Sequence, residues 1–211
     1  FYKLAIITFL IVFLTGAVLI KKFNFFKHIP AAFLSISDSE KKIKKTNHLQ
    51  ISSQKGVYST VWTAKSKRIN DLIKLADETE INAIVIDVKD SGIYIDDYIN
   101  GLISELREKN IYSIARLVVF QDSSQIKSHP DWYFKTSGGD LWRDNRGWYW
   151  MDPAERGTWD YNVEISKAAI DAGFDELNFD YIRYPAFKKN DDVVFPPEGE
   201  VILKNSVIND F

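Results

Sequence analysis

The chain has 211 residues, and its 27 lysine and arginine side chains nearly balance 29 aspartate and glutamate side chains, which leaves a net charge of −2 at pH 7. A near-neutral charge gives no electrostatic footprint for nucleic acid, so we expect no nucleic-acid partner. The chain contains no cysteine, which excludes disulfides, thiol catalysis and cysteine-ligated metal. Its three histidines are not paired at ligand spacing, so we expect no metal site and no cofactor.

The first predicted element is an apolar segment, residues 4–20, which contains seventeen residues and no charge. Its length approaches the roughly 20 residues of a membrane-spanning helix and exceeds the ~7–15 apolar residues of a signal peptide. No A-x-A cleavage site follows it. We therefore expect residues 1–27 to be an uncleaved transmembrane signal anchor. A cleaved signal peptide and a buried core helix are the alternatives.

The charges around this segment leave its orientation ambiguous. Lys3 precedes the segment, whereas Lys21, Lys22 and Lys27 follow it. Taken literally, the positive-inside rule would place the rest of the chain in the cytoplasm. Because the chain begins with Phe1 rather than methionine, we interpret it as a fragment cut at both ends. We therefore give the number of lysines on each side of the segment little weight. The prediction is a membrane-anchored protein whose folded domain lies outside the cytoplasm.

A polar linker, residues 28–55, is predicted between the anchor and the folded domain. It contains the lysine-rich run Lys41–Lys45. A solvated spacer is the ordinary explanation of such a run, and contact with anionic lipid head groups is the alternative.

From Gly56 onwards, apolar strands alternate with amphipathic helices. In the first helix, for example, Ile69, Leu72 and Ile73 fall on one face. A long loop rich in aromatic residues, 121–155, interrupts the alternation. The predicted strands are 56–62, 82–88, 111–120 and 175–182, and the predicted helices are 66–80, 98–110 and 158–173, the last of which ends at Gly173.

This alternation predicts an α/β fold in which helices cover parallel strands. Two architectures fit the order: an eight-stranded βα barrel and an open, doubly wound sheet. The stretch after the first strand, VWTAKSKR, has no glycine-rich phosphate loop, which disfavours a dinucleotide-binding sheet. A full (β/α)8 TIM barrel needs about 250 residues. We therefore expect residues 56–211 to form the N-terminal half of such a barrel, with about four βα units.

Polar side chains gather where the predicted strands end. Because side chains alternate along a strand, Asp87 and Lys89 share the face opposite the aliphatic residues of the second strand. We expect Arg116 in the third strand, and Asn178 and Asp180 in the fourth, to point into the barrel as well. In barrels of this kind the functional residues lie at the C-terminal ends of the strands. A buried charge without a partner costs several kcal/mol, so these residues must pair or meet a ligand.

Two interpretations of these five residues remain open. One is a structural network that pairs Asp87 with Lys89, or Asp180 with Arg116. The other is a polar pocket that contains a reactive carboxylate. A carboxylate beside a cation stays ionised, which suits a nucleophile or a stabiliser of positive charge. Asp87, Lys89, Arg116, Asn178 and Asp180 are therefore candidate site residues, and the pairing alone does not choose between the two carboxylates.

The loop HPDWYFKTSGGDLWRDNRGWYWMDP, residues 129–153, adds candidates on the same rim. Aromatic rings stack on the apolar faces of sugar rings, so we predict that Trp148 and Trp150 bind substrate. Asp152 is a further candidate, although an Asp-Pro pair is also typical of a helix start. Packing within the loop is the alternative role for its other tryptophans.

The stretch NFDYIRYP, residues 178–185, ends the last predicted strand with an acid, an arginine and two tyrosines. We predict that Arg183 and the two tyrosines, Tyr181 and Tyr184, hold the carboxylate of Asp180 in position. Arg183 and Tyr184 are also predicted to contact the substrate. Pro185 would then end the strand and begin the next loop.

Six stretches between residues 56 and 187 form a pattern of motifs: GVYSTVWT, NAIVIDVKD, IYSIARLVVFQD, HPDW, LWRDNRGWYWMDP and GFDELNFDYIRYP. With these motifs the chain resembles a bacterial family of glycoside-hydrolase-like barrel domains, itself remotely similar to the α-amylase superfamily. The resemblance implies a (β/α)8 barrel whose nucleophile, here Asp180, ends the fourth strand. Amylases carry an arginine two residues before that aspartate, where this chain has Asn178, so Arg116 or Arg183 would supply the cation. The acid would be expected after a fifth strand.

The leading hypothesis is a membrane-anchored glycoside hydrolase that acts on envelope or extracellular polysaccharide. The inward-facing carboxylates, the aromatic rim and the predicted anchor are the observations behind it. A non-catalytic carbohydrate-binding barrel of the cell envelope is the alternative. A structural envelope protein whose barrel binds a protein partner is a third possibility.

Overall fold

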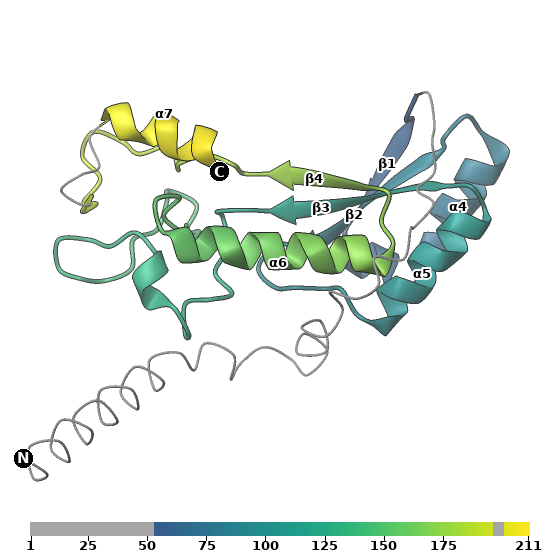
Figure 1. Cartoon of the computed structure of the whole chain (residues 1–211), viewed down its shortest axis with the longest axis horizontal. Helices are drawn as coiled ribbons and strands as arrows, with labels where there is room; N and C mark the ends of the chain where they lie inside the picture. The colour runs from purple at the N-terminus through teal and green to yellow at the C-terminus, as the bar shows by residue number, and fades with distance from the viewer. Residues whose placement is uncertain (1–52, 196–200) are drawn as a thin grey trace, which may run out of the picture. The chain divides into compact units, whose positions relative to one another are not determined.

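A parallel sheet lies at the centre of the structure, and its strands follow one another in chain order (Figure 1). The computed structural model describes residues 53–195 and 201–211. Within these residues the sheet has four strands in the order β1-β2-β3-β4, and each neighbouring pair is parallel. This confirms the predicted α/β fold. The strands are β1 (Gly56–Ser59), β2 (Ala83–Lys89), β3 (Tyr112–Val118) and β4 (Glu176–Asp180).

The long helices between successive strands lie along one face of the sheet (Figure 1). In a parallel sheet each crossover is right-handed, so strands added in sequential order place all their helices on the same side. A doubly wound sheet reverses its strand order and has helices on both faces, whereas this order is that of a barrel wall. The helices are α3 (Val61–Ala64), α4 (Ile69–Glu78), α5 (Asp97–Glu108), the 3-10 turn η3 (Pro130–Trp132), α6 (Arg156–Ala172) and α7 (Val201–Asp210).

The first strand is shorter than predicted because a helix cap interrupts it. Thr60 has an extended backbone, and its hydroxyl oxygen accepts a hydrogen bond from the backbone N–H of Thr63 at 3.2 Å. A threonine in this position starts a helix. The predicted strand 56–62 therefore divides into β1 and the single turn of α3.

The main core lies between the sheet and its helices. Ile84 and Ile86 of β2 are fully buried on the helix-facing side, together with Ile99 and Leu106 of α5. Burying one such side chain contributes roughly 1.5–3 kcal/mol. Gly173 ends α6 with a φ of 97°, a left-handed conformation that glycine adopts at little cost, which confirms the predicted stop.

The aromatic loop between β3 and α6 has a core of its own. The aromatic residues of this loop pack with the end of β3, and of the two roles left open for Trp132 and Trp142 the structure shows packing. A Cβ at Gly157 would lie 2.7 Å from Cζ2 of Trp132, so only glycine leaves room for that ring. The buried members of this cluster are Val119, Phe120, Trp132, Tyr133, Phe134, Trp142, Trp150 and Met151.

Two earlier predictions concern residues that the structure does not describe. The anchor, residues 1–27, lies wholly outside the described residues, and the linker 28–55 lies outside them up to residue 52. At the end of the linker, the Lys55 backbone N–H and the Ser53 carbonyl oxygen each hydrogen-bond the side-chain amide of Asn82 at 2.8 Å. Among the helices of the described segments, none has the length and apolar character needed to cross a membrane.

Candidate active site

The C-terminal ends of β2, β3 and β4 bring three charged side chains into contact. The guanidinium of Arg116 donates from Nη1 to Asp87 Oδ1 at 2.7 Å. On its other side it donates from Nε and Nη2 to Asp180 Oδ2, at 3.0 and 2.6 Å. Asp87, Arg116 and Asp180 therefore converge as predicted, with the arginine between the two carboxylates.

Tyr58, at the end of β1, completes this row and was not among the predicted site residues. Its hydroxyl donates a hydrogen bond to Asp87 Oδ2, and the guanidinium of Arg116 lies 5.7 Å from its ring centre. Burial, helped by the hydrogen bond to Asp87 and the charge on it, raises the pKa of Tyr58 to about 12. Tyr58 pairs in register with Val85, two residues before Asp87, so strand parity applied to β1 would have placed it on this face.

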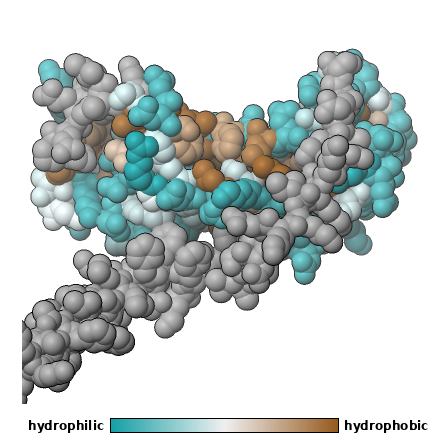
Figure 2. Space-filling view, viewed as in Figure 1, coloured by the Kyte–Doolittle hydropathy of each residue, from teal (hydrophilic) through white to brown (hydrophobic). Residues whose placement is uncertain are grey.

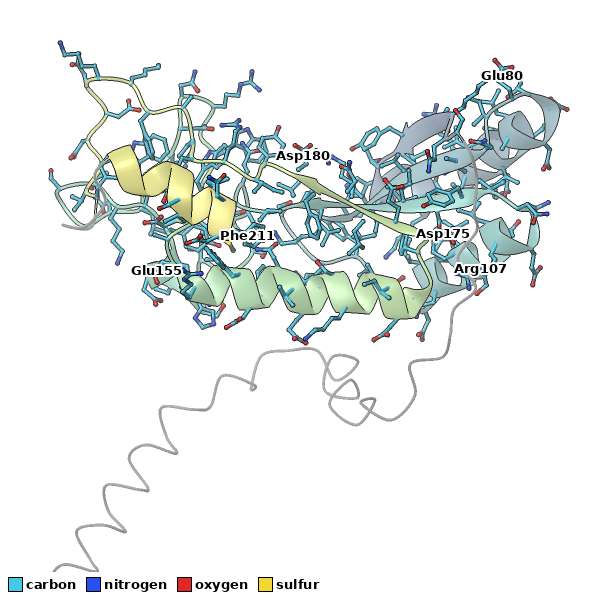
Figure 3. All side chains as sticks on the ribbon, turned by 45° about the horizontal axis from the view of Figure 1, so that its top comes forward. Glu80, Arg107, Glu155, Asp175, Asp180 and Phe211 are labelled. Atoms are coloured by element: carbon cyan, nitrogen blue, oxygen red, sulfur yellow. The ribbon has the colours of Figure 1, made fainter. Side chains whose placement is uncertain are left out.

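Each oxygen of the Asp180 carboxylate has its own partner. Oδ2 accepts both hydrogen bonds from Arg116, and Oδ1 accepts one from the backbone N–H of Tyr181 at 2.7 Å. The side chain remains 44% exposed, and Figure 3 shows Asp180 at the far end of β4 from Asp175. Tyr181 has a φ of 57°, an unusual left-handed conformation for a tyrosine. The carboxylate is therefore fixed in direction and still open to a ligand.

The pair of carboxylates keeps the guanidinium charged. Burial alone would lower the pKa of Arg116, but the hydrogen bonds that it donates to Asp87 and Asp180, and the charges of these carboxylates, raise the pKa above its usual value. Two carboxylates around one guanidinium leave an excess of negative charge at the strand ends. Such an arrangement favours positive charge that develops in a bound ligand.

A pocket of about 280 Å³ opens beside these strand ends. Its volume lies just below the range of roughly 300–1,000 Å³ usual for small-molecule sites. Trp148 projects into it from the aromatic loop and is 51% exposed. Polar groups and exposed rings therefore surround the same space. Its lining includes Tyr58, Trp62, Asp87, Arg116, Trp148 and Tyr181.

The structure corrects the predicted role of Lys89. The β2–β3 register shifts between Asp87 and Lys89, so the two side chains do not continue along one face. Lys89 is fully buried, where its ammonium lies 2.9 Å from Asp122 Oδ2 and donates to the carbonyl oxygens of Val118 and Val119. Burial lowers its pKa, and the charge of Asp122 opposes that shift. Lys89 thus holds the end of β3 in place and does not face the pocket.

Trp150 and Asp152 are also placed differently from the prediction. Trp150 is 2% exposed, and its indole N–H donates to Asp144 Oδ2 at 3.0 Å. Asp152 is buried, and its Oδ1 accepts from the backbone N–H of Ala154 at 2.9 Å. Both side chains are buried and order the loop. The expectation that they bind substrate does not fit these positions.

The remaining predicted residues lie on β4 and just after it. Asn178 is exposed and pairs in register with Arg116. The guanidinium of Arg183 lies 4.7 Å from the ring centre of Trp150 and donates to the carbonyl oxygen of Tyr184 at 3.1 Å. Burial, with the nearby charge of Asp152, raises the pKa of Tyr184 to about 12. Of the two arginines considered as the cation beside Asp180, Arg116 is therefore the one that binds its carboxylate.

In residues 53–195 and 201–211 no group of three or more histidine, aspartate or glutamate side chains is placed to hold a metal ion.

We expect Arg116→Met to destabilise the protein by about 1–3 kcal/mol, because it leaves the buried carboxylate of Asp87 without its charged partner. Arg116→Lys should be destabilised less, because lysine keeps the positive charge but cannot bind two carboxylates as the planar guanidinium does. Tyr58→Phe is the matched control, because it removes one donor to Asp87 and keeps the ring. Urea unfolding measures all three variants. A wild-type unfolding free energy in Arg116→Met would contradict the bridged arrangement.

Comparison with known proteins supports the class to which this fold and site belong. A hypothetical protein from Ruminiclostridium thermocellum is 34% identical, with a TM-score of 0.65 over 73% of this chain and 87% of that chain. The α-galactosidase from Lactobacillus brevis has the same fold at 15% identity, with a TM-score of 0.53 over 74% of this chain and 24% of that chain. No curated protein matches the sequence.

The sequential parallel βα units are those of a barrel wall, and the Lactobacillus brevis α-galactosidase shares this fold. The chain belongs to the family described as "Putative glycosyl hydrolase domain", whose model matches residues 92–211. The resemblance deduced from its sequence motifs is thereby confirmed.

Proposed function

We propose that this chain provides the first βα units of a glycoside hydrolase and that Asp180 is its catalytic carboxylate. The observation that carries the proposal is the state of Asp180: an exposed carboxylate at the end of β4, held through one oxygen by Arg116 and through the other by a backbone N–H. Catalytic residues of barrel enzymes occupy this end of the strands.

Cleavage of a glycosidic bond passes through a transition state in which the sugar ring resembles an oxocarbenium ion between two carboxyl groups. Asp180 would face the positive charge on the ring, as a nucleophile or as a stabiliser of that charge. Because Arg116 and the Tyr181 N–H already fix the carboxylate, it needs no reorganisation when the charge develops. Asp87 and Tyr58 would hold Arg116 in place, and Trp148 would stack on the apolar face of a sugar.

The direct test is hydrolysis of polysaccharides, read as new reducing ends by mass spectrometry. A panel of neutral envelope and extracellular polysaccharides is incubated with the full-length gene product and with its Asp180→Asn variant. We expect products from the wild type and at least roughly 10²-fold less product from the variant. If the wild type binds a polysaccharide and releases no sugar, the chain is instead the carbohydrate-binding module considered from the sequence.

We further propose that residues 1–27 anchor the domain through the apolar segment 4–20, with residues 28–55 as a spacer and the domain outside the cytoplasm. The absence of charge over this segment and of a small-residue cleavage site after it support the anchor. Envelope and extracellular polysaccharides lie on the outer side of the membrane, which supports the location.

Carbonate extraction tests the anchor. The protein should stay in the membrane pellet, because roughly 20 apolar residues insert almost irreversibly. A variant that lacks residues 1–27 should appear in the supernatant and serves as the control. If the wild-type gene product is instead recovered in the supernatant and its N-terminus is shortened, the segment is a cleaved signal peptide.

A further inference from the structure

We propose that Trp62 and Asp90 form a second sugar-binding subsite, so that the pocket takes a neutral oligosaccharide longer than one sugar unit. This inference rests on the proposed function and names the substrate class of the same pocket. Trp62 and Asp90 were not predicted as site residues, and both line the pocket.

The fold presents the Trp62 ring to solvent. In the single turn of α3, Val61 and Ala64 face the core and are buried, so the intervening Trp62 points outward and is 71% exposed. The turn itself is fixed, since Thr60 caps its start and Ala64 donates to the Thr60 carbonyl oxygen at 2.9 Å. A large apolar ring thus stands on a rigid base beside a polar pocket.

A neighbouring network supports this ring and leaves an oxygen for a ligand. Tyr94 packs against Trp62 with ring centres 5.8 Å apart, and its hydroxyl donates to Asp90 Oδ1 at 2.8 Å. The hydroxyl of Ser91 also donates to Asp90 Oδ1, at 2.7 Å. All of these donors fall on Oδ1, so Oδ2 of Asp90 is available to a sugar hydroxyl. An aromatic face beside a carboxylate oxygen matches the apolar face and hydroxyl edge of a sugar.

Two segments far apart in the sequence contribute exposed tryptophans to the pocket. Trp62 follows β1, whereas Trp148 belongs to the loop after β3. Burial of one such ring would contribute roughly 1.5–3 kcal/mol to folding, and here both rings are left largely in water. Exposed apolar surface gathered around a pocket marks a binding site. Because one sugar ring covers one indole face, two indole rings on separate segments indicate a ligand of at least two sugar units.

The charge of the pocket points to a neutral oligosaccharide. Of the described residues that line it, Asp87 and Asp90 are acidic and Arg116 is basic. The guanidinium of Arg116 is already bound to Asp87 and Asp180. An acidic sugar such as a uronate would meet carboxylates without a free cation to pair with, whereas sugar hydroxyls can donate to them.

The test is calorimetric binding of neutral galacto-, malto- and cello-oligosaccharides of one to six units, in an Asp180→Asn background that keeps them intact. For the linkage that binds, Trp62→Ala should raise the Kd for the tetrasaccharide roughly tenfold, or about 1.4 kcal/mol. The Kd for the monosaccharide should change less than about twofold. Trp62→Phe should restore most of the tetrasaccharide affinity, because it keeps an aromatic face.

Leu75→Ala is the control, because Leu75 is an exposed apolar side chain on α4 outside the pocket lining, and it should leave every Kd unchanged. An oligogalacturonate should bind at least roughly tenfold more weakly than the neutral tetrasaccharide. Equal tetrasaccharide affinity with and without the Trp62 ring would overturn the subsite while leaving hydrolysis by the wild type intact. Tight uronate binding, or no oligosaccharide binding at all, would also overturn the proposed subsite. Absence of hydrolysis by the wild type would separately refute the proposed function.

Discussion

Asp180→Asn is expected to reduce glycoside turnover by at least about 10²–10³-fold, the loss typical when one preorganised electrostatic group is removed from a transition state. Asparagine keeps the shape but carries no negative charge, and its single amide oxygen can accept from Arg116 or from the Tyr181 N–H, not from both. The melting temperature should change little, because the side chain is 44% exposed and Arg116 keeps Asp87 as a partner. Sugar binding should be retained.

Thermal unfolding and hydrolysis measured on the same preparation separate a catalytic carboxylate from a structural one. Asp171→Asn, at an exposed position on α6, is the control for loss of one acidic charge. A purely structural role for Asp180 predicts a lower melting temperature with normal turnover of the folded fraction. That pattern in Asp180→Asn would refute the catalytic assignment.

Lys89→Met should cost on the order of 3–5 kcal/mol of folding free energy, the largest stability loss expected for a single substitution here. The side chains of Lys89 and Asp122 are both 0% exposed, so the variant leaves the Asp122 carboxylate buried without a cation. The carbonyl oxygens of Val118 and Val119 lose a donor as well.

The double variant Lys89→Met/Asp122→Asn should recover part of this loss in urea unfolding, because it removes the orphaned charge and keeps an acceptor for the Ser124 N–H. A loss below about 1 kcal/mol in the single variant would show that water or another cation reaches Asp122. Together the two variants measure how strongly the end of β3 depends on this ion pair.

The repeating elements of the fold could be predicted because their signal is local. The buried stripe of α5 and the apolar run of β2 repeat with the periods of a helix and a strand, and both elements begin and end within two residues of the prediction. The strand 56–62 was predicted too long, since the apolar residues of α3 continue the pattern of β1. Only the cap at Thr60 separates the two elements, and a single residue type gives a weak signal.

The site residues were predicted correctly where side chains alternate regularly between the two faces of a strand. They were predicted incorrectly where this alternation is broken. Asp87 and Arg116 are opposite each other in the β2–β3 register, so alternation was enough to bring them together. The irregularity after Asp87 breaks the alternation, and no local pattern shows that Lys89 turns to Asp122. In the aromatic loop, Trp148 and Trp150 are two residues apart, yet one is exposed and the other is buried by a turn around Asp144.

The left-handed backbone of Tyr181 affects which residue selection would retain at position 181. Such a conformation costs a non-glycine residue roughly 1–2 kcal/mol, which asparagine or glycine would largely avoid. A laboratory selection for heat tolerance alone would therefore be drawn towards those residues at position 181. The tyrosine ring lines the pocket and packs on Trp150, so a selection for sugar processing would retain it. Variants evolved under the two selections should therefore carry different residues at position 181. The residue found there indicates whether the barrel is selected for catalysis or only for folding.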